Sequence, residues 1–167
     1  SSFHLFFCDM QQEKMEGLQA QIKEQFQKAF DDLLEQKLKE KDYEWVARLY
    51  VEIRDRICAL IPRRADVHAQ IKEQMDEVIF RQMLDADAYK PEDLVNLIGY
   101  VFHWFAQLQS PARDTSTEEK KQALFALLST PGTTLASFVP VFVKTTHAVL
   151  DEIEADKAAF REQMSKK

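Results

Sequence analysis

The sequence predicts an all-α protein, a single helical bundle of about six helices that begins with a long N-terminal helix. Three observations favour this class. Glycine and proline are scarce, with 3 and 5 in 167 residues, so regular elements can run long. Apolar residues recur at steps of three and four, the period of an amphipathic helix. The apolar content of 46 % suits a chain with its own core, so we expect residues 1–167 to form one helical domain.

The stretch from Asp42 to Ile61 is predicted to be the central helix. Asp42 suits the N-cap, and Pro62 cannot continue a helix. We expect a second helix, from Pro91 to Gln109, to form the central pair with it. Aromatic and branched residues give the first of the two a wide apolar stripe: Trp45, Val46, Leu49, Tyr50, Ile53, Ile57, Leu60 and Ile61.

The N-terminal forty residues are predicted to have two parts. Residues 1–10 form an apolar segment, which either folds back onto the bundle or makes a dimer or partner contact. Residues 11–40 form the long helix, with Asp9 suited to its N-cap. The first half of that helix is polar apart from a narrow seam, so it is expected to project and pair with another helix. The short segment is dense in large apolar residues: Phe3, Leu5, Phe6, Phe7 and Met10.

The rest of the bundle body, residues 42–163, is divided by loops that contain proline. A third helix is predicted from Val67 to Asp85, capped by Asp66, with Val78 and Ile79 among its buried residues. A fifth follows Ser116 or Thr117 and ends at Pro131-Gly132. The last helix is predicted from Thr134 to Gln163, where the internal Pro140 requires either a later start or a kink.

Charge and composition exclude several classes of protein. The net charge of −6 disfavours nucleic acid as a partner. No apolar run approaches the ~20 residues that span a bilayer. Two cysteines, Cys8 and Cys58, provide no disulfide framework, so a reducing, cytoplasmic setting is expected. The chain begins with serine, and we expect it to be one domain of a longer protein.

No constellation of catalytic or metal-binding residues is evident. His4 and Cys8 are four residues apart, but a zinc site needs about four ligands and no second pair follows. With three glycines, a phosphate-binding loop is not available. The other histidines accompany no nucleophile in a known motif. We therefore expect neither a metal, a cofactor nor enzymatic activity.

The order of several segments resembles the T-complex protein 11 family. KAFDDLLEQKL at residues 28–38 is followed by DY at 42–43 and EIRDRICALIPRR at 52–64. QIKEQMDEVIFRQ at 70–82 and SPARD at 110–114 complete the match, which covers over half of the chain. Asp31 stands where the family usually has tryptophan, and a cysteine before the proline loop is absent.

The resemblance implies an all-helical adaptor or regulator without known catalytic activity. The family has been connected with cAMP and protein kinase A signalling, and in sperm with flagellar function, so a flagellar or cytoskeletal association is an expectation. The alternative is a structural self-assembly domain, a homodimer formed by the long first helix and the apolar segment.

Two loops that contain arginine are the remaining candidate partner sites. Arg63 and Arg64 follow the central helix, and Arg113 with Asp114 lies in the proline loop. In one interpretation Arg113 or Asp114 ties its loop to a neighbouring helix end. In the other, the arginines form a small basic surface for an acidic partner segment or a phosphate, together at one end of the bundle.

Overall fold

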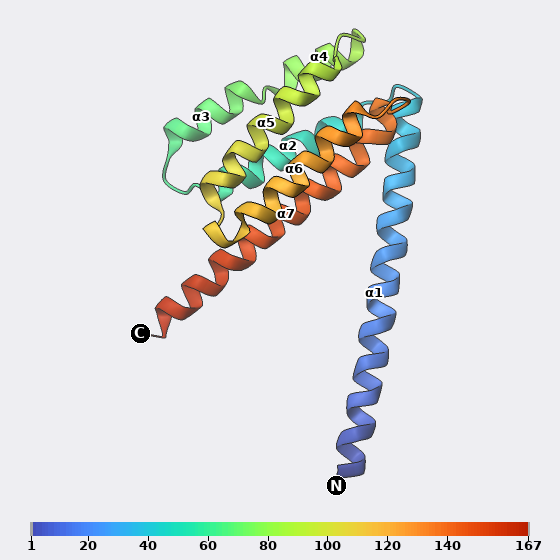
Figure 1. Ribbon diagram of the computed structural model, residues 1–167, viewed down its shortest axis with the longest axis vertical. Coiled ribbons are helices and arrows are strands. Elements are labelled where there is room, and N and C mark those ends of the chain that lie inside the picture. Colours follow the sequence, from blue (N-terminus) through green and yellow to red (C-terminus); the bar gives the residue numbers. More distant parts are fainter. Residues whose placement is uncertain (1, 167) are drawn as a thin grey trace.

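A computed structural model shows the architecture of the chain (Figure 1). It describes residues 2–166, with side chains from His4 onward. Within this range every regular element is a helix, which confirms the all-α prediction. In order they are α1 (Ser2–Lys39), α2 (Glu44–Ala59), α3 (Ala65–Gln74), α4 (Glu77–Asp85), α5 (Pro91–Leu108), the 3-10 helix η1 (Pro111–Arg113), α6 (Asp114–Ser129) and α7 (Leu135–Ser165).

The C-terminal helix α7 lies at the centre of the core. It packs against α1, α2, α5 and α6, and its first half is buried on most sides. The predicted stripe of α2 is confirmed, since Ile53 and Ile57 are buried and Trp45 is half-buried. However, α2 and α5 do not form a central pair. Both pack on α7 and have no comparable contact with each other, because α7 lies between them.

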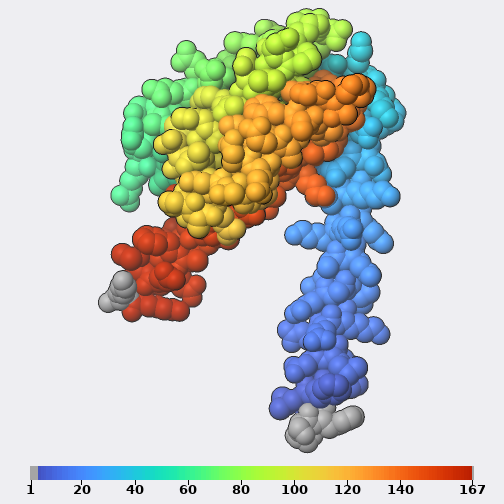
Figure 2. All heavy atoms as spheres, in the orientation of Figure 1, coloured from blue at the N-terminus to red at the C-terminus, as the bar shows by residue number. Residues whose placement is uncertain are grey.

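The first helix is one continuous arm that projects from the body (Figures 1 and 2). Only its C-terminal end is anchored, by the buried Leu34 and Leu38 and by Phe30, whose ring stacks on Trp45 with centroids 5.9 Å apart. The prediction that residues 1–10 form a separate segment capped by Asp9 is wrong. Those residues extend the helix from Ser2, so the fold-back alternative is wrong as well.

The third predicted helix is broken at Met75 and Asp76. Asp76 is extended at ψ 117° and caps α4 by accepting a hydrogen bond from the amide of Ile79 at 3.0 Å. The break lets α3 and α4 pack separately on α2, with Met75 buried between them. Val78 and Ile79 were predicted to be buried, but they are 62 % and 54 % exposed because α4 has turned relative to α3.

The later helix boundaries follow local chemistry. Asp93 accepts from the amide of Lys90 at 2.8 Å at the start of α5, and Thr134 accepts from the amide of Ser137 at 3.1 Å at the start of α7. The fifth predicted helix, α6, begins at Asp114, before the predicted cap, because Pro111–Arg113 already forms a helical turn. The last helix runs from Leu135 through the buried Pro140, so the alternative of a later start is wrong.

Two other predicted caps are placed differently. Asp42 lies one residue before the N-cap of α2, where Oδ1 accepts from the amide of Glu44 at 3.3 Å. Asp66 lies in the first turn of α3, whose N-cap is Arg64.

Candidate interaction surfaces

The arm presents an unpaired apolar stripe. Every residue from His4 to Ala29 is exposed, whatever its polarity. Of the candidate residues in the N-terminal cluster, Phe6 is 62 % and Phe7 49 % exposed, while the side chain of Phe3 lies outside the described residues. The stripe continues toward the body through Met15, Leu18, Ile22, Phe26 and Leu33, each at least 43 % exposed.

The stripe is large enough to form a protein interface. Nine large apolar side chains of α1 are about half exposed, and the six of them that form the stripe expose on the order of 600 Å². A standard interface buries about 800 Å² on each partner, whereas isolated apolar residues on a monomer need no explanation. The helical spacing of the stripe fits the apolar face of another helix.

The predicted arginine residues of the first loop are exposed at the far end of α2. Arg63 has a positive φ of 66° and makes no ion pair with the described residues. Arg64 forms a two-pronged ion pair with Asp66, both distances being 3.1 Å. This pair raises the pKa of Arg64 and lowers that of Asp66. Asp66 therefore neutralises part of the proposed basic surface.

The proline loop is attached to α7 by an ion pair. Arg113 donates from Nε and Nη2 to the two oxygens of Asp156 on α7, each at 3.0 Å, which lowers the pKa of Asp156. Asp114 accepts from the side-chain amide of Gln109 at 2.8 Å. This arrangement matches the interpretation in which the loop is attached to a neighbouring helix. It leaves Arg63 as the one candidate arginine that is unpaired among the described residues.

The two loops meet at a surface pocket of about 650 Å³. Leu60 and Pro62 line it from one side, Gln109 and Ser110 from the second, and the end of α7 from the third. Phe160 of α7 is 63 % exposed there. Both loops thus lie at the same end of the body, but the pocket is lined by apolar residues and mixed charges, not by a basic cluster.

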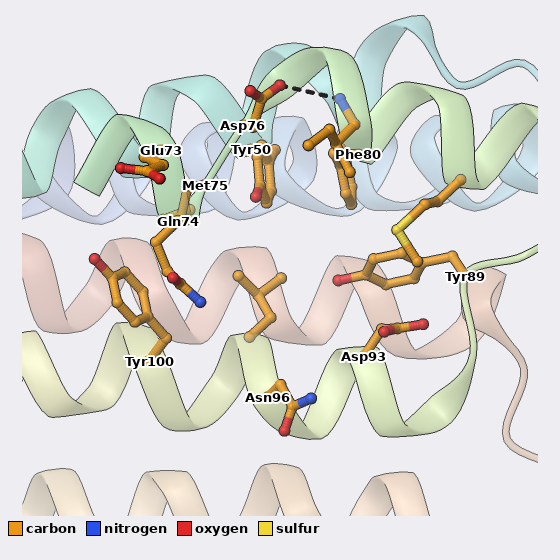
Figure 3. A pocket seen from close by; sticks show the side chains of 13 residues that line it. Tyr50, Glu73, Gln74, Met75, Asp76, Phe80, Tyr89, Asp93, Asn96 and Tyr100 are labelled. Carbon is orange, nitrogen blue, oxygen red and sulfur yellow. Dashed lines mark hydrogen bonds between the residues drawn. The ribbon is translucent and has the colours of Figure 1, made fainter. Parts of the chain in front are cut away.

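A second opening, of about 230 Å³, lies where α3 ends and α4 begins (Figure 3). Tyr50 stacks on Phe80 with ring centroids 4.0 Å apart, and Tyr89 meets Phe80 edge-on at 5.2 Å. Burial raises the pKa values of the Tyr50 and Tyr89 phenols, so both stay protonated. Glu73 and Asp93 also line the opening, and no lysine or arginine does. Aromatic faces beside carboxylates suit a cationic side chain.

A polar cluster between α2 and α7 was not predicted. Arg56 donates to Asp151 at 2.8 Å and to Glu154 at 3.3 Å, and lies 2.6 Å from Nδ1 of His147. Burial lowers the pKa of His147, and the nearby guanidinium acts in the same direction. Arg56 is more than ninety positions from each of the other three residues in the sequence, so no local pattern predicts the cluster.

The described residues contain neither a metal-binding group nor a helix suited to spanning a membrane. No group of three histidine, cysteine, aspartate or glutamate side chains is placed to hold a metal ion in the part of the chain that the structure describes. His4 Nε2 and Cys8 Sγ lie 3.7 Å apart on α1. Among residues 2–166, no helix combines the length and apolar content needed to cross a bilayer.

The fold and its surfaces define an all-helical protein with a long projecting helix at one end. The family model for T-complex protein 11 matches residues 8–165, nearly the whole chain. The chain belongs to the T-complex protein 11 family. Comparison with curated proteins and comparison with solved structures gave no match.

Proposed function

We propose that this chain is a non-enzymatic protein-interaction module whose docking element is α1. The observation that supports the proposal is the exposed stripe from Phe7 to Leu33 on a helix whose base alone packs on α2 and α7. Burial of an apolar helical face of this length against a matching helix is favourable, because it removes apolar surface from water. The body holds the base of the arm in place and leaves its outer part accessible.

The family suggests the setting in which the module works. By analogy with the T-complex protein 11 family, we propose an adaptor or regulator in cyclic-nucleotide and protein kinase A signalling or in the flagellum. The exposed stripe of α1 supports the docking role. Membership of the family supports the proposed setting.

Capture of partners by tagged protein tests the docking role. Leu18→Asp with Ile22→Asp places two carboxylates in the middle of the stripe, where a partner helix would have to bury them. We expect proteins captured from cells by the native chain to be lost with this variant. Both residues are about half exposed in the free chain, so the body should melt at an unchanged temperature.

A matched variant controls for added charge on exposed apolar positions. Val95→Asp with Val141→Asp changes two residues that are 44 % and 42 % exposed on the body. This variant should capture the same proteins as the native chain. If the α1 variant retains every captured protein, or if Arg63→Glu alone abolishes capture, α1 is not the docking element.

A further inference from the structure

The apolar stripe of α1 is arranged symmetrically about Ala20. Leu18 and Ile22 lie two residues to either side of it. Phe7 and Leu33 lie thirteen residues to either side of it, whereas Met15 and Phe26 lie five and six residues from it. Such symmetry suits two identical helices that pair in antiparallel orientation across a twofold axis, because residue i of one copy then faces residue 40 − i of the other.

We infer that two copies of this chain pair through α1 as antiparallel helices, with the twofold axis close to Ala20. The inference rests on the proposed docking role of α1, since it names the partner of the same surface. Leu18 of one copy packs against Ile22 of the other, and Phe7 against Leu33, while Met15 and Phe26 meet one residue out of register. These contacts repeat on both sides of the axis, so the interface is self-complementary and closed.

The flanks nearest to the axis carry no charge. In the antiparallel register Gln19 of one copy lies opposite Gln21 of the other, and each side-chain amide can both donate to and accept from its counterpart. No like charges therefore meet where the two helices are closest to the axis.

The exposed length of α1 agrees with an interface of this size. The exposed part from His4 to Ala29 is about 40 Å long at 1.5 Å per residue. Gly17 lies within it and weakens an isolated helix. Most of the stability of a protein helix comes from packing of its apolar face, which the exposed part of α1 lacks. The six stripe residues expose roughly 600 Å² per copy, a little less than the ~800 Å² of a standard interface, so burial of the stripe can stabilise both the arm and the pair.

The ends of the pair also find contacts. At the base of α1 a surface groove of about 220 Å³ lies between Phe30, Trp45, Arg48 and Leu49. In the antiparallel register Met10 of the other copy lies opposite Phe30, so the N-terminal turns of that copy reach the level of this groove. The N-terminal apolar cluster and the groove therefore belong to the same interface.

Light scattering on the full chain tests whether the pair exists. The native protein should have twice the 19.5 kDa mass of one chain across the micromolar range. Leu18→Asp with Ile22→Asp should give the mass of one chain and a lower helical signal by circular dichroism. Val95→Asp with Val141→Asp should retain the double mass. Weak pairs form at concentrations up to roughly 200 µM. A native protein that still has the mass of one chain at that concentration overturns the inference.

Disulfide trapping tests the direction. The background variant Cys8→Ser removes the exposed native thiol. In this background, Gln11→Cys and Ala29→Cys each place a thiol in line with the stripe, on opposite sides of the twofold axis. A mixture of the two single variants should form a crosslinked pair, because residue 11 faces residue 29. The Gln11→Cys variant alone should crosslink poorly, since its two copies are about 27 Å apart. Efficient crosslinking of Gln11→Cys with itself indicates a parallel pair and overturns the antiparallel arrangement.

The two proposals fail in different ways. A monomeric native chain that still captures cellular proteins through Leu18 and Ile22 retains the docking role of α1 and overturns self-pairing. A monomeric chain whose captured proteins do not depend on these residues overturns both.

Discussion

The break between α3 and α4 leads to a prediction that uses two isoleucines eight residues apart. Ile71 is 0 % exposed and Ile79 is 54 % exposed, although the sequence pattern placed both in the core. Ile→Ala at each site removes the same atoms and gives the same small gain in helix propensity. The difference between the two variants therefore measures burial alone.

The expected magnitudes follow from the packing around each side chain. Deleting the buried side chain of Ile71 loses its transfer free energy and leaves a cavity, which costs about 3 kcal/mol. At Ile79 about half of the side chain is already in water, so the cost stays below ~1 kcal/mol. For a chain of this length the first change should lower the melting temperature by roughly 6–12 °C, and the second by about 3 °C or less.

Urea denaturation followed by circular dichroism at one protein concentration measures both variants. The midpoint should fall strongly for Ile71→Ala and little for Ile79→Ala, with similar slopes. Equal losses would mean that the helix continues through Met75 and Asp76, which refutes the break and the turn of α4.

Three further outcomes are expected. Burial lowers the pKa of His147 in the folded chain, so the unfolded chain takes up a proton at this histidine first as the pH falls. The folded state therefore keeps its full stability above pH 6.5, the ordinary pKa of histidine, and loses stability as the pH falls below that value. His147→Gln, which still accepts from Arg56, should flatten that part of a stability curve between pH 7 and 5. Arg113→Gln should raise the pKa of Asp156 toward its ordinary value, which carboxyl NMR titration measures; an unchanged value would show that the ion pair does not form in solution. Asp76→Ala should destabilise the chain by about 1 kcal/mol through loss of the α4 cap, and Asp76→Asn should restore most of it in thermal melts.

Much of the fold follows from short-range patterns. The stripe of α2 identified a buried helix because its period and its width are properties of one segment. The starts of α5 and α7 could be assigned because Pro91 fixes its own φ for the first turn and Thr134 accepts from an amide within one turn. These features depend on neighbours that the sequence itself places side by side.

Other features depend on contacts that periodicity does not describe. Val78 and Ile79 continue the apolar spacing of α3, but the capping signal of Asp76 followed by Glu77 outweighs that spacing. The central position of α7 is set by the packing of four other helices on it. The N-terminal cluster has large apolar residues on every side of the helix, so it shows no stripe of its own. Its continuation of α1 could therefore not be predicted from apolar periodicity.

The candidate site residues show the same division. The arginines were selected as loop residues where packing does not demand a charge, yet the partner of Arg113 is Asp156, forty-three residues later. A pairing over that distance decides whether a charge is available to a partner. The exposed stripe of α1, in contrast, was expected from the polar composition of its first half.

The continuity of α1 has a mechanical consequence. The helix that exposes Leu18 enters the core at Leu34 and Leu38 without a hinge, and its base rests on the first turns of α7. When a partner covers its stripe, α1 holds whatever is bound near Leu18 at about 24 Å along the axis from Leu34. A sideways pull on the tip of such a paired helix would act as torque on α7, so α1 would both set a distance and transmit load to the interior.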